Sequence, residues 1–117
     1  MSAAPAHPVD IAHLSRYTGG DAALNAEVLQ LFVDQSAMLL RELQGILEAQ
    51  DAKGWKHVTH SLKGAARGIG AFGLADVAAE AEPLDPTVQM AETLTAVAAL
   101  RAKADTVHLF IKGYLGR

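Results

Sequence analysis

Apolar residues recur along most of the chain at steps of three and four, the spacing of helices that bury one face. A short first helix is predicted from Val9 and ends near Gly19 and Gly20. The next segment carries no proline from Ala22 to Gln50, and Asp21 is its predicted N-cap. Its apolar positions are Leu24, Val28, Leu31, Phe32, Leu39, Leu43, Ile46 and Leu47. The pattern predicts one long helix, or two helices with a break near residues 34–37.

Asp51 is the predicted N-cap of the next helix, in which the apolar positions are Trp55, Val58, Leu62, Ala65, Ile69 and Phe72. A loop is predicted around Pro83, Asp85 and Pro86, because proline lacks a backbone donor and disfavours helix before it. The last helix has a seam of Val97, Leu100, Ala104, Val107, Ile111 and Tyr114, and Gly113 or Gly116 ends it.

These segments predict an all-α fold, an antiparallel bundle of three or four helices, because no run alternates convincingly enough to form a strand. We expect a flexible tail over residues 1–8 and a single domain over residues 9–117. Leu39 and Leu40 are adjacent, so one helix face cannot bury both equally. One of the two is therefore a candidate for a partner surface.

The amino-acid composition argues against several classes of protein. The 117 residues contain no cysteine, which excludes disulfide frameworks and cysteine nucleophiles. The formal net charge of −3 argues against nucleic-acid binding, which usually needs excess positive charge. No apolar run is long enough to cross a bilayer, and the first residues do not resemble a signal peptide. We therefore expect a cytoplasmic protein with no nucleic-acid or membrane partner.

The candidate chemistry is concentrated around His60. At about 100° per residue, Lys56, Lys63, Gly64 and Arg67 lie within roughly 60° of His60 around the helix axis. The apolar positions of the same helix lie on the opposite side. A neutral imidazole is a nucleophile, and nearby cations both favour the neutral form and stabilise an attached phosphoryl group. A glycine in a helix costs about 1 kcal/mol relative to alanine, and Gly64 leaves space beside the ring for a bulky partner.

The segment His60-Ser61-Leu62-Lys63-Gly64, followed by Ile69-Gly70, resembles the His-x-Leu-Lys-Gly motif of histidine phosphotransfer (HPt) domains, with a glycine ten residues after the histidine. The resemblance extends over nearly the whole chain, and implies an antiparallel four-helix bundle with a short N-terminal helix. Gly68 and the second histidine, His57, are not part of the family pattern.

The resemblance implies that His60 accepts a phosphoryl group from a receiver-domain aspartate and passes it to another response-regulator receiver. Lys63 and, secondarily, Arg67 would support the charge of the phosphoryl group, and Gly64 would give clearance. The partners would be hybrid histidine kinases and receiver domains acting on a monomer. We expect a carrier without autokinase or ATPase activity, with no cofactor or metal of its own and with Mg²⁺ on the receiver.

Three alternatives have different requirements. A metal-binding bundle could use His57 and His60 with His108 or an acid, although bundle metal sites face inward. A histidine kinase dimerisation domain has an acidic residue after its histidine, where this chain has Ser61. An adaptor that binds receivers without accepting phosphoryl groups would need neither His60 nor Lys63. His7 and His13 carry no local cluster of chemistry.

Overall fold

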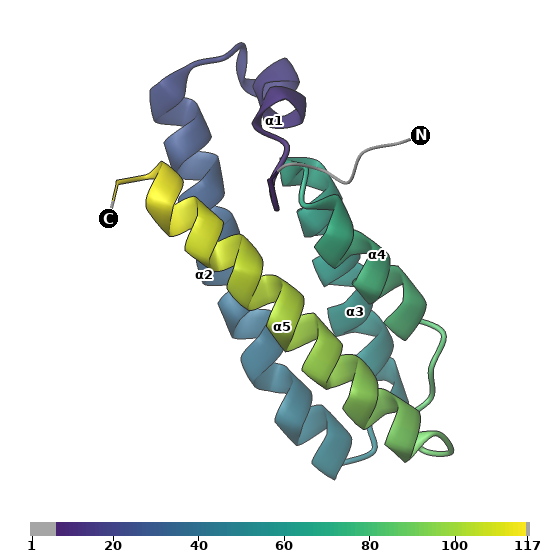
Figure 1. The fold of residues 1–117 in the computed structure, drawn as a ribbon. Coiled ribbons are helices and arrows are strands. Elements are labelled where there is room, and N and C mark those ends of the chain that lie inside the picture. The colour runs from purple at the N-terminus through teal and green to yellow at the C-terminus, as the bar shows by residue number, and fades with distance from the viewer. Residues whose placement is uncertain (1–6, 117) are drawn as a thin grey trace.

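The computed structural model describes residues 7–116, which form five helices (Figure 1). They are α1 (Ile11–Thr18), α2 (Ala22–Glu48), α3 (Ala52–Ile69), α4 (Phe72–Ala81) and α5 (Met90–Tyr114). Helices α2 to α5 alternate in direction and form a four-helix bundle, and the short α1 lies at one end of it (Figure 1). The predicted all-α antiparallel bundle is confirmed. Most of the predicted tail, residues 1–6, lies outside the described residues.

Aspartate side chains begin the first three helices. Asp21 and Asp51, both predicted caps, accept hydrogen bonds from backbone N–H groups in the first turns of α2 and α3. Asp10 does the same for α1. Each such cap stabilises a helix by typically about 1 kcal/mol, because the first N–H groups have no partner within the helix. The caps therefore fix where α3, the helix that carries His60, begins.

Helix α2 is continuous, so the predicted alternative of a break near residues 34–37 is wrong. It packs against both α3 and α5, and its buried face is wide enough to cover Leu39 and Leu40. Neither leucine is therefore free for a partner. Leu24 and Leu31, predicted as buried positions, are 40% and 66% exposed, because they lie on the outer side of this wide face.

The apolar repeat predicted one helix through Phe72, and this prediction is wrong because the helix ends before Gly70. Helix α3 ends at Ile69, and Gly70 adopts a left-handed φ of 86°. Its carbonyl accepts a 2.9 Å hydrogen bond from the backbone N–H of Asp10. A Cβ at Gly70 would lie 2.6 Å from the Asp10 carbonyl oxygen, so this turn requires glycine. Phe72 belongs to α4 and is partly exposed.

The loop predicted around Pro83 and Pro86 connects α4 to α5. Helix α5 ends at Tyr114, and Gly116 follows with a left-handed φ of 76°. Tyr114 is exposed rather than part of the seam, because it lies in the last turn of α5. No helix within residues 7–116 is long and apolar enough to cross a membrane.

Trp55 joins α3 to α4 inside the core. Its side chain is fully buried, and its indole N–H donates a 2.9 Å hydrogen bond to the carbonyl of Ala81, the last residue of α4. Buried polar groups of this kind are normally paired, and an indole N–H is a donor only. The C-terminal end of α4 is thereby held against Trp55, in the first turn of α3.

Candidate functional site

His60 lies on the side of α3 that faces away from the core. Its side chain is 68% exposed, whereas Val58, Leu62 and Ile69 on the same helix are buried. The division of α3 into an apolar face and a histidine face therefore agrees with the sequence analysis. The ring can be reached by a large partner.

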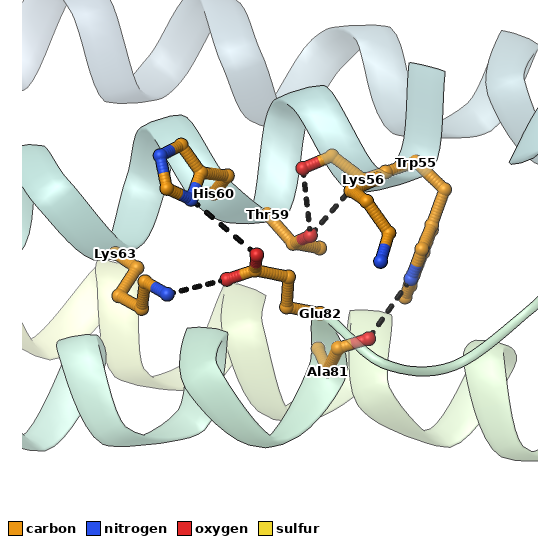
Figure 2. A network of polar contacts seen from close by, with 7 residues as sticks. All are labelled: Trp55, Lys56, Thr59, His60, Lys63, Ala81 and Glu82. Atoms are coloured by element: carbon orange, nitrogen blue, oxygen red, sulfur yellow. Dashed lines mark hydrogen bonds and ion pairs between the residues drawn. The ribbon is translucent and has the colours of Figure 1, made fainter. Parts of the chain in front are cut away.

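Glu82, just after the last turn of α4, lies between His60 and Lys63 (Figure 2). One carboxylate oxygen, Oε2, is 3.3 Å from Nδ1 of His60. The other, Oε1, is 2.6 Å from Nζ of Lys63. The hydrogen bond from Lys63 lowers the pKa of Glu82 most, partial burial raises it, and the charge of Lys63 and the contact with His60 lower it further. Glu82 is therefore a carboxylate at neutral pH.

The contact with Glu82 selects the tautomer of His60. An ionised carboxylate accepts hydrogen bonds and donates none, so the ring nitrogen that faces it, Nδ1, carries the hydrogen. In a neutral imidazole the other nitrogen then has the lone pair. Figure 2 shows that this second nitrogen, Nε2, lies on the edge of the ring turned away from Glu82. The site presents a nucleophilic nitrogen outward.

Gly64 and Arg67 lie where the helical spacing predicts, on the exposed side of α3. A Cβ added to Gly64 would have no heavy atom within 4 Å, so nothing in the described structure requires glycine there. Lys63 is brought next to His60 as predicted, but its ammonium group is paired with Glu82. Lys56 is exposed.

His57 and His108 lie apart from this arrangement. His57 borders a surface hollow with Glu42 and Ile46 of α2. His108 is on α5, and its Nε2 is 2.7 Å from Oγ of Ser36 on α2. Over residues 7–116 no three histidine, cysteine or acidic side chains are grouped so that they could hold a metal ion. The grouping that the metal-binding alternative needs is thus not found in this part of the chain.

Glu82 is the site residue that the sequence analysis did not single out. It is 22 positions from His60 and directly follows α4, and the two residues meet through the packing of α4 on α3. The available signal was an acidic residue directly before the loop predicted at Pro83. That signal does not give the register of one helix on another.

The fold and the site together define a class: a helical bundle that presents one oriented, exposed imidazole beside a cation. The family model of the Hpt domain matches residues 27–108. The structure is similar to the crystal structure of histidine-containing phosphotransfer protein B (HptB) from Pseudomonas aeruginosa PAO1, with a TM-score of 0.85, 25% identity and 98% of each chain covered. A search of curated protein sequences found no match.

The chain belongs to the Hpt domain family, and its function is histidine phosphotransfer in phosphorelays. Members of this family are phosphoryl carriers whose partners are histidine kinases and receiver domains. The family and the four-helix bundle inferred from the resemblance are confirmed.

Proposed function

We propose that Nε2 of His60 accepts a phosphoryl group from a receiver-domain aspartate and passes it to the aspartate of another receiver. The observation that carries this assignment is the contact between His60 Nδ1 and Glu82, which leaves the lone pair on the exposed Nε2. His57, three residues away, has no carboxylate within ion-pair distance in the described structure. Of these two neighbouring histidines, His60 is therefore the one whose tautomer is set by a carboxylate.

The transfer requires no proton movement at His60. The Nε2 lone pair attacks phosphorus, the N–P bond forms as the P–O bond to the aspartate breaks, and the aspartate leaves as a carboxylate. Nδ1 keeps its hydrogen, so the phosphorylated ring is cationic, and Glu82 offsets that charge. In the onward step the receiver carboxylate attacks phosphorus, and a neutral imidazole leaves. The same hydrogen bond therefore serves both directions.

Charge and space around the ring support the transferred group. The phosphoryl group brings negative charge next to Lys63, whose ammonium is 2.6 Å from Glu82, and it approaches the exposed side on which Arg67 lies. Cations placed there stabilise the transferring oxygens, because phosphoryl transfer depends mainly on positioning and charge neutralisation. Gly64 leaves the space beside His60 open. Lys63 is the principal charge support in this proposal, and Arg67 is secondary.

In this function the protein is a monomeric carrier without autokinase or ATPase activity. The donor is a hybrid histidine kinase, the acceptor is a response regulator, and Mg²⁺ resides on the receiver. The described residues supply a nucleophile and its supports, which is sufficient for a carrier. The cytoplasmic location stays a prediction from the sequence.

The test is phosphotransfer from a phosphorylated receiver to wild type, His60→Gln and the matched control His57→Gln. We expect an acid-labile, base-stable label on wild type and His57→Gln and none on His60→Gln. Label retained by His60→Gln would overturn the assignment. Incubation with ATP alone should label none of the three proteins, and labelling of wild type would contradict the carrier function.

A further inference from the structure

The carbonyl of Ala81 fixes the end of α4, directly before Glu82. It accepts two hydrogen bonds, one of 2.9 Å from the buried indole of Trp55 and one of 3.1 Å from the backbone N–H of Leu84. The last carbonyls of a helix have no partner within the helix, so partners from elsewhere determine where the chain goes next. Here one partner comes from the core and the other closes the turn after Glu82.

The local sequence does not favour the observed conformation of Glu82. A residue before proline prefers extended backbone, because the proline ring crowds the helical arrangement. Glu82 precedes Pro83 and nevertheless has φ −56° and ψ −43°. The backbone N–H of Glu82 continues the hydrogen bonds of α4 by donating to the carbonyl of Ala78 at 3.0 Å, and the side chain contacts His60 and Lys63 of α3.

We propose that Trp55 is a positioning residue, whose indole N–H sets the tautomer of His60 by holding Ala81 and hence the Glu82 carboxylate in place (Figure 2). Trp55, His60 and Lys63 all belong to α3, so a single helix contacts the end of α4 through the Ala81 carbonyl and again through the Glu82 carboxylate. Loss of the hydrogen bond from Trp55 to Ala81 would therefore let the Glu82 carboxylate move away from His60. That the tautomer of His60 affects the rate of phosphotransfer rests on the proposed function. The tautomer itself can be measured whether or not the protein transfers a phosphoryl group.

The experiment reads the ring nitrogens of His60 by long-range ¹H–¹⁵N correlation spectra at about pH 8, where ordinary histidines are neutral. In wild type we expect hydrogen on Nδ1 and a lone pair on Nε2. In Trp55→Phe, as in Glu82→Ala, both ¹⁵N shifts should move toward each other as the Nε2–H form becomes populated. Ile111→Val, a core change between α2 and α5, should keep the wild-type spectrum and so controls for loss of packing.

A second variant removes the hydrogen bond without changing the core. Benzothienylalanine at position 55 replaces the indole N–H by sulfur and retains the shape of the ring, so it serves where Trp55→Phe does not fold. Wild-type shifts of His60 in either Trp55 variant, together with altered shifts in Glu82→Ala, would overturn the positioning role. Failure of the proposed function can be distinguished from failure of the positioning role. The first would appear as phosphoryl label retained by His60→Gln, whatever tautomer of His60 the spectra of wild type show.

Discussion

At the scale of single residues, the two nitrogens of His60 have different tasks. Nδ1 contacts Glu82 at 3.3 Å, and in the proposed function Nε2 accepts the phosphoryl group. Glu82 in turn contacts Lys63, so one carboxylate orients the nucleophile and holds a cation next to it. The proposed function therefore makes the reactivity of His60 depend on Glu82, which does not itself contact the phosphoryl group.

Replacement of Glu82 separates its charge from its hydrogen bond. Glu82→Gln can still accept from Nδ1 but does not offset the cationic ring, whereas Glu82→Ala does neither. We expect transfer to slow by about tenfold in Glu82→Ala, the equivalent of about 1.4 kcal/mol, and by less in Glu82→Gln. Rapid-quench measurement of transfer from a phosphorylated receiver checks the order. Equal rates of phosphotransfer in wild type and both variants would show that Glu82 does not contribute to the transfer.

Gly64 and Gly68 form a matched pair on α3, because a Cβ at either position would have no heavy atom within 4 Å. Leucine at either position should raise the stability of the helix by about 0.5–1 kcal/mol. Only Gly64→Leu should slow transfer, since Gly64 is one turn from His60. Thermal unfolding and transfer rates test both statements. Unchanged transfer in Gly64→Leu would remove the clearance role.

At the scale of elements, the glycine ten residues after His60 has a structural task. Gly70 ends α3 in a left-handed conformation, and Asp10 fills the space where its side chain would be. Its contacts join the start of α1 to the turn between α3 and α4.

Gly70→Ala should destabilise the fold by at least about 1–2 kcal/mol, because a left-handed residue with a Cβ is disfavoured and the Cβ also meets Asp10. Gly116→Ala is the control, since Gly116 has φ 76° but open space around it. Urea unfolding should show the larger loss in Gly70→Ala, while the folded fraction still accepts phosphate. A similar decrease in the free energy of unfolding of both variants would show that the contact with Asp10 does not contribute to the effect.

Helices α2 and α5 are joined by a hydrogen bond from a partly buried histidine, His108. Ser36 is buried and donates its hydroxyl hydrogen to the carbonyl of Phe32, so it accepts from Nε2 of His108. Burial lowers the pKa of His108, and the charge of Asp105 raises it by a smaller amount. The folded protein therefore holds His108 in its neutral form to a lower pH than the unfolded chain does.

The sign of the pH effect follows from proton binding. As the pH falls below about 6.5, the unfolded chain protonates this histidine before the folded protein does, so stability decreases. We expect wild type to lose more stability than His108→Gln between about pH 7.5 and pH 5.5 in urea unfolding. A constant difference between the two proteins over that range would contradict the lowered pKa.

Helix boundaries were predictable where a local signal exists. Asp21 and Asp51 mark helix starts, and the repeat of apolar residues places His60 opposite the core. The break at Gly70 was missed because the same repeat continues through Phe72. The exposure of Leu31 was missed because an apolar residue at helical spacing can lie on the outer side of a helix that has two neighbours.

At the scale of the whole molecule, the net charge of −3 conceals a local arrangement. The sequence predicted three cations around His60, namely Lys56, Lys63 and Arg67. The packing of α4 adds Glu82 to that group and pairs it with Lys63. His60, Lys63 and Gly64 could be predicted because they share one helix. Glu82 and Trp55 could not be assigned roles, because those depend on how α4 packs on α3.

In the proposed function the phosphoryl group is carried on Nε2 of His60 while Nδ1 keeps its hydrogen. The most direct measurement is ³¹P and ¹⁵N NMR of the protein phosphorylated by a receiver and labelled with ¹⁵N-histidine. We predict a single phosphohistidine, at His60, with phosphorus bonded to Nε2 and hydrogen on Nδ1. A phosphoryl group on Nδ1 of His60, or on His57, would contradict the assignment of Nε2 of His60.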